Sequence, residues 1–131
     1  MRSRSRFCAA FAVLALAIGL GAPGSANAQQ QLREESVRTF MDYAWALTPA
    51  KFTTPNGKSI VIDRNKRDEM TVPVDDARKV ILVGRLTAHA QMCELGELQV
   101  LNYQSLMRRM RASEKWTDQQ LVFINQLHLT T

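Results

Sequence analysis

The sequence predicts a mainly α domain of about four helices with a short β-hairpin near residues 51–62, placed after an N-terminal signal peptide. Apolar side chains recur at spacings of three and four residues in segments 30–47 and 76–112, the period of an amphipathic helix. The segment 118–129 is apolar nearly all round a helical wheel, which indicates a helix that needs burial on several sides. Three β-branched residues at 60–62 follow a proline-asparagine-glycine turn, which predicts the hairpin.

The first 28 residues have the three parts of a secretory signal peptide. Its positive start, apolar run and small cleavage-site residues are Arg2, Arg4 and Arg6, then residues 7–20, then Ala26 and Ala28. The alternative is a membrane anchor, but a spanning helix needs about 20 apolar residues and this run is shorter. We therefore expect cleavage after residue 28. One periplasmic or secreted domain, residues 29–131, would remain without a membrane span.

Cleavage changes what the composition indicates. The precursor has 17 basic and 12 acidic residues, and removal of three arginines leaves 14 basic against 12 acidic. This near balance gives no general case for nucleic-acid binding. Cleavage also removes Cys8 and leaves Cys93 as the single cysteine, so no disulfide would form within the mature chain. A small exported domain without such a link is expected to rely on packing or on a partner.

The first expected helix, residues 30–47, ends where Thr48 precedes Pro49, because the residue before proline is disfavoured in helical geometry. The hairpin arms are expected at 51–54 and 59–62. The following segment, 63–70, has six charged residues in eight and is predicted to be an exposed connection.

A long helical region follows, in which Pro73 and two aspartates mark the start. Gly96 can cap one helix and so separate two helices, 76–94 and 97–112, or it can be a close-approach point inside one long helix. We favour the first alternative, a break in the helix at Gly96. A packing seam is predicted from residues spaced alternately by four and three: Leu82, Leu86, His89, Cys93, Gly96, Val100, Tyr103, Met107 and Met110.

The last helix, 118–129, has the clearest start, because Thr117 and Gln120 have the spacing of a capping box. Since this helix is apolar nearly all round, it is expected either to insert between the other helices or to offer part of its surface to another molecule. Under the second alternative, the predicted interaction residues are Cys93, Phe123 and Leu127.

A soft-metal site is the most specific chemistry that the sequence offers. His89, Met92 and Cys93 lie three and four residues apart, so one helix face can present an imidazole, a thioether and a thiol. Such ligands suit Cu(I). The alternative is burial in the packing seam, where cysteine and methionine act as apolar side chains. The sequence leaves open whether Cys93 stays reduced, binds metal or forms an intermolecular disulfide.

Enzyme signatures are not found in the sequence, which contains no Cys-x-x-Cys pair, phosphate-binding loop or nucleophile elbow. No catalytic residue and no cofactor is therefore predicted. A basic cluster, Arg108, Arg109, Arg111 and Lys115, is interpreted as the cationic end of a helix rather than as an anion or nucleic-acid site, because no stacking aromatic residues alternate with it.

The stretch from Arg85 to the end, with its segments MCEL and KWTDQQLVFINQLHL, resembles small uncharacterised exported proteins of alphaproteobacteria. The resemblance covers under half of the chain. It implies a periplasmic bacterial protein and carries over no catalytic residue, cofactor or substrate.

Together these features predict a non-catalytic periplasmic binding or interaction module. Its expected partner is a second copy of the chain or another protein, and no nucleic acid or small-molecule substrate is indicated. The alternative function is periplasmic binding of a soft metal such as copper through His89, Met92 and Cys93.

Overall fold

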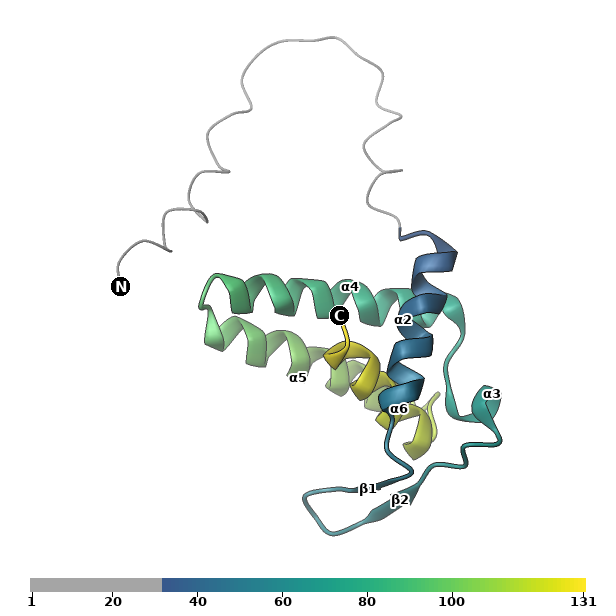
Figure 1. The fold of residues 1–131 in the computed structure, drawn as a ribbon. Helices are drawn as coiled ribbons and strands as arrows, with labels where there is room; N and C mark the ends of the chain where they lie inside the picture. The colour runs from purple at the N-terminus through teal and green to yellow at the C-terminus, as the bar shows by residue number, and fades with distance from the viewer. Residues whose placement is uncertain (1–31) are drawn as a thin grey trace, which may run out of the picture. The chain divides into compact units, whose positions relative to one another are not determined.

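Five helices and one two-stranded antiparallel sheet make up residues 32–131, the part of the chain that the computed structural model describes (Figure 1). The elements are α2 (Glu34–Leu47), β1 (Lys51–Thr53), β2 (Ser59–Val61), α3 (Arg67–Met70), α4 (Val74–Met92), α5 (Gly96–Ala112) and α6 (Asp118–Leu129). The mainly α fold with a short hairpin is confirmed. The predicted signal peptide, residues 1–28, lies outside the described residues.

Helices α4 and α5 form an antiparallel hairpin and lie side by side in Figure 1. In the turn between them Glu94 has a positive φ of 59°. The Glu94 N–H donates to the Gln91 carbonyl at 3.0 Å, and the Leu95 N–H donates to the Ala90 carbonyl at 2.8 Å. This is the Schellman pattern of a helix end. The predicted break is confirmed, but Gly96 begins α5 and does not cap α4, because Glu94 takes the left-handed position.

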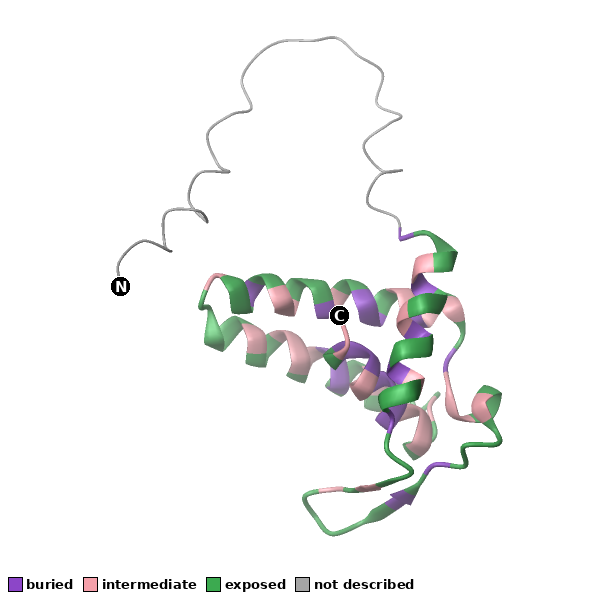
Figure 2. Cartoon of the chain, in the orientation of Figure 1, coloured by how far each residue is buried: buried purple, intermediate pink, exposed green. Residues whose placement is uncertain are grey.

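Helix α6 lies at the centre of the fold and packs against α4, α2 and α5. Its side chains Phe123, Ile124 and Leu127 are fully buried (Figure 2). The capping box at its start is confirmed, because the Gln120 N–H donates to Thr117 Oγ1 at 3.2 Å and the Thr117 N–H donates to Gln120 Oε1 at 3.0 Å. Of the two alternatives for this helix, insertion between the others is the one observed.

The core uses a different face of α4 from the one that the spacing predicts. Leu82, Leu86 and His89 of the predicted seam are exposed, and so is Val100 of α5. The residues of α4 that are buried instead are Ala77, Val80, Ile81, Gly84 and Ala90. Apolar residues occupy more than one face of α4, so their spacing alone does not select the packed face. The observed face contains small residues, which let another helix approach closely.

The β-hairpin has the predicted strands, with Phe52 opposite Ile60 in the antiparallel register. Gly57 in the connecting turn has a φ of 84°, as a left-handed turn residue requires. Ile60 and Ile62 pack with Val122 of α6 in a small second core cluster. The hairpin is therefore supported by the central helix, as an isolated two-stranded sheet needs to be.

The segment 63–70 is largely exposed, as its charge predicts, but it also contains the short helix α3, which was not predicted. Arg64 donates to the carbonyl oxygens of Trp45 and Thr48 at 2.8 Å each. Its guanidinium carbon also lies 4.4 Å from the centroid of a Trp45 ring, a cation–π contact. Arg67 pairs with Asp42 of α2. These contacts span 16 to 25 residues, so local sequence does not reveal them.

Gly84 lies where α4 and the end of α6 approach closely. A Cβ atom built on Gly84 would lie 1.8 Å from Thr131 Oγ1 and 3.0 Å from the backbone oxygen of His128. The first contact involves the end of a side chain that can move, but the second involves helix backbone. The absence of a side chain at this position therefore permits the packing of α6 on α4.

Replacement of Gly84 by valine is expected to lower the free energy of unfolding by about 1–3 kcal/mol, because the added atoms force these helices apart. Urea denaturation followed by circular dichroism measures the change. Gly96→Ala is the matched control, since a Cβ there meets nothing within 4 Å, and it should leave the stability unchanged or slightly raised. An equal loss in both variants would contradict the close-approach role of Gly84.

Candidate functional site

The three predicted metal ligands lie at the end of α4 without forming an enclosed site. His89 and Met92 are exposed, the latter at 80%, and Cys93 is half-buried at the helix end. Within residues 32–131 no group of three or more His, Cys, Asp or Glu side chains is arranged to hold a metal ion. The geometry therefore adds no ligand to the sequence pattern.

The prediction that Cys93 is the single cysteine needs a correction. The full chain has two cysteines, so "single cysteine" describes only the chain that the expected cleavage would leave. In the structure Cys93 is disulfide-bonded. A disulfide sulfur is not the thiolate that binds soft metals. The structure thus offers no support for Cys93 as a metal ligand.

The other two predicted interaction residues, Phe123 and Leu127, are both 0% exposed. They lie in the main core cluster between α6 and its neighbours and cannot present a contact surface in this conformation. These two residues were predicted to interact under the alternative in which α6 offers part of its surface to another molecule. That alternative is not the one observed, because the four other helices, together with strand β2, surround α6 in the folded chain.

The exposed apolar surface lies instead on the α4–α5 hairpin. Among residues 32–131, seven of the eleven exposed large hydrophobic side chains fall within the segment 82–101. We call them the hairpin surface: Leu82, Leu86, Met92, Leu95, Leu98, Val100 and Leu101. The sequence contained a signal for this surface, because Glu94 and Glu97 are the only charged residues between Leu86 and Met107.

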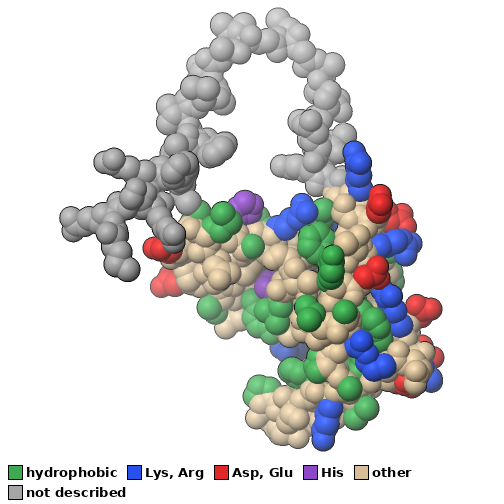
Figure 3. All heavy atoms as spheres, viewed as in Figure 1, with side chains coloured by type: hydrophobic (Ala, Val, Ile, Leu, Met, Phe, Trp, Pro, Cys, Tyr) green, Lys and Arg blue, Asp and Glu red, His purple; other side chains and the backbone are tan. Residues whose placement is uncertain are grey.

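One side of the hairpin surface is hollowed. A groove of about 270 Å³ there is lined by Leu86, His89, Ala90, Cys93, Leu95, Leu98 and Asn102. Most of these side chains are apolar. On the face shown in Figure 3, acidic groups lie at the tip of the hairpin, and most other charges lie over the opposite end of the domain.

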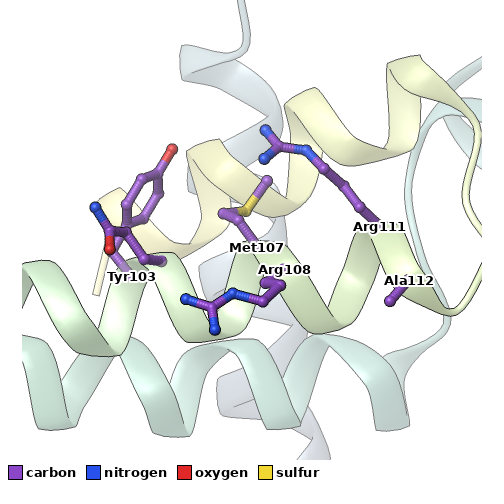
Figure 4. A pocket seen from close by; sticks show the side chains of 6 residues that line it. Tyr103, Met107, Arg108, Arg111 and Ala112 are labelled. Carbon is purple, nitrogen blue, oxygen red and sulfur yellow. The ribbon is translucent and has the colours of Figure 1, made fainter.

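A second groove, of about 630 Å³, runs along α5 (Figure 4). It is lined by Tyr103, Gln104, Met107, Arg108, Arg111 and Ala112. Figure 4 shows the Arg111 side chain and the Tyr103 ring on either side of Met107, all projecting from one helix. The Tyr103 hydroxyl donates to Asn125 Oδ1 of α6 at 2.8 Å, which fixes the ring at one end of the groove. The groove therefore combines an apolar floor with a cationic rim.

The basic cluster of the sequence is divided in two by the fold. Lys115 is separated from the arginines and forms an ion pair with Asp76 of α4 at 2.8 Å. The hydrogen bond from Lys115 lowers the pKa of the Asp76 carboxyl below its usual value, and Lys79 adds to this effect against the opposing effect of burial. Lys115 therefore ties the α5–α6 connection to α4, whereas Arg108 and Arg111 remain on the exposed face of α5.

His128 is a buried titratable group whose ring packs against Tyr103, a residue that lines the α5 groove. Its ring centroid lies 5.4 Å from that of Tyr103, and its Nε2 lies 3.1 Å from Thr87 Oγ1. The Thr87 hydroxyl donates to the Val83 carbonyl at 3.0 Å, so its oxygen is left to accept from an Nε2–H. Nδ1 is then an unprotonated nitrogen, buried without a hydrogen-bond partner among residues 32–131. Burial lowers the pKa of His128 below its ordinary value near 6.5.

The stability of the domain is expected to fall as the pH drops from 8 to 5.5. Since the folded-state pKa of His128 lies below the unfolded-state value, the unfolded chain takes up the proton first. The contribution of the neutral ring is complete above the unfolded-state pKa and is lost as the pH falls through and below about 6.5. Urea unfolding at several pH values measures this slope. His128→Phe should flatten it, whereas the exposed control His89→Phe should not; an unchanged slope in His128→Phe would refute the assignment.

Each helix within residues 32–131 is too short or too polar to cross a bilayer. Comparison with known proteins identifies no matching family model, no significantly similar curated protein and no significantly similar solved structure.

Proposed function

We propose that this chain is an exported, non-catalytic interaction module that binds a protein through the hairpin surface. The observation that carries the proposal is the concentration of exposed large apolar side chains on one helical hairpin. Single exposed apolar residues are ordinary on protein surfaces, but a large contiguous apolar patch usually marks a binding surface.

The chemistry of the hairpin surface favours an apolar protein face as its partner. Between Leu86 and Met107 the only charges are negative, at Glu94 and Glu97. Acidic groups oppose binding to nucleic acid and to anionic lipid. The shape also fits, because the groove between α4 and α5 is lined mainly by apolar side chains, and such a groove accommodates the apolar side of a helix.

Export is the second part of the proposal, and its support is the sequence pattern of residues 1–28. The basic start, the short apolar run and the small residues before Gln29 support cleavage in the periplasm of a bacterium or on a secretory route. A small module in such a compartment acts by contact with other exported proteins or with itself.

Expression of the full chain in a bacterial host should yield a periplasmic product that begins at Gln29. Mass spectrometry of the intact protein and of its N-terminal peptide checks this outcome. The control is Ala28→Pro, which should block processing, because signal peptidase requires a small residue before the cut. A cytoplasmic product that retains residues 1–28 would refute the export proposal.

Placement of a photoreactive amino acid at Leu98 should produce a defined covalent adduct when the producing cells are irradiated. The matched control is Leu47, which is 63% exposed compared with 43% for Leu98 but lies on α2, away from the hairpin surface. Gel electrophoresis and mass spectrometry identify the adduct. Failure of Leu98 to give an adduct, or equal labelling from Leu47, would contradict a protein-binding role for the hairpin surface.

A further inference from the structure

The outward face of α5 has a self-complementary order of side chains. Six residues with spacings of three and four are all exposed on it: Glu97, Val100, Leu101, Gln104, Arg108 and Arg111. We call them the α5 stripe. Residues at these spacings share one face of a helix. Along the stripe an acid comes first, two apolar residues follow, and two arginines lie at the far end.

The charges of the α5 stripe are available for an outside partner. Within residues 32–131, Glu97, Arg108 and Arg111 make no ion pair. Lys115, the member of the basic cluster that follows α5 in the chain, already forms an ion pair with Asp76. The negative charge of the stripe lies near the start of α5 and its positive charges lie near the end.

The apolar residues of the α5 stripe also have a matching recess. Val100 and Leu101 are each 54% exposed and lie about one turn before the groove of Figure 4. That groove has Met107 in its floor and Arg108 and Arg111 at its rim. One helix therefore carries both the projecting apolar side chains and a recess that can receive them.

From this order we infer that a second copy of the chain binds antiparallel along the α5 stripe, with the two-fold axis at Gln104. The inference rests on the proposed protein-binding function and identifies a second copy as the partner. In that register Glu97 of each copy faces Arg111 of the other, and Val100 faces Arg108. Leu101 of each copy lies beside Arg108 of the other, at the rim of the groove. A two-fold interface uses the same patch on both copies, so one stripe supplies every contact twice.

The charges distinguish this arrangement from a parallel one. A parallel pair would place Glu97 against Glu97 and Arg111 against Arg111, and juxtaposed like charges weaken association. The antiparallel pair brings opposite charges together at both ends and also opposes the two helix dipoles. Helix α5 has 17 residues and is about 25 Å long. One helix face buries less than the ~800 Å² per partner of a stable complex, so a concentration-dependent dimer is expected.

Sedimentation velocity on the full chain over a range of concentrations tests the dimer. Glu97→Arg and Arg111→Glu should each raise the dimer dissociation constant by about tenfold or more, because each creates two like-charge contacts. An equimolar mixture of the two variants should recover the dimer, and so should the double variant, since both restore opposite charges at each end. Lys51→Glu, an exposed charge change on β1, is the control and should have no effect.

Each result bears on the proposal. A chain that stays monomeric at all concentrations, or a mixture that fails to recover the dimer, overturns the antiparallel pairing. Circular dichroism separates loss of pairing from loss of folding. If the chain stays monomeric while Leu98 still gives an adduct with a different protein, the second copy is excluded as partner and the protein-binding function stands.

Discussion

The arrangement of every other element in this domain follows from the need to bury α6. Its residues Val122, Phe123, Ile124 and Leu127 face in several directions, so no single neighbour can cover them. Helices α2, α4 and α5 enclose α6, and the β-hairpin covers Val122. Gly84 lets α4 approach closely enough to complete this enclosure. The removal of this apolar surface from water is the largest favourable contribution to the stability of such a small domain.

The length of α6 explains why the α4–α5 hairpin has an uncovered end. Helix α6 has 12 residues, whereas α4 has 19 and α5 has 17. At about 1.5 Å per residue, α6 falls roughly 10 Å short of α4. The part of the hairpin beyond α6 therefore has a core-facing side but no third helix to cover it. Leu86, Leu95 and Leu98, which line the groove between α4 and α5, are left exposed there, whereas Val100 and Leu101 lie on the outward face of α5.

The distribution of charge separates the surfaces of the domain. Around α2, α3 and the start of α4, basic and acidic groups are largely paired with each other, as in Arg67 with Asp42 and Lys115 with Asp76. These contacts hold loops and helix ends in place. Toward the hairpin tip the few charges make no such pairs within residues 32–131. This contrast distinguishes a surface that stabilises the fold from one suited to a partner.

Elements whose signals are local could be predicted from the sequence. The capping box at Thr117, the turn at Gly57 and the break near Gly96 each depend on residues a few positions apart. Which helix faces are buried depends on long-range packing, because α4 has apolar residues on more than one side and only its neighbours select between them. For the same reason Phe123 and Leu127 became core, and Leu98 and Leu101 became surface. The helix α3 and the anchoring of Arg64 also depend on long-range packing, since their partners lie far away along the chain.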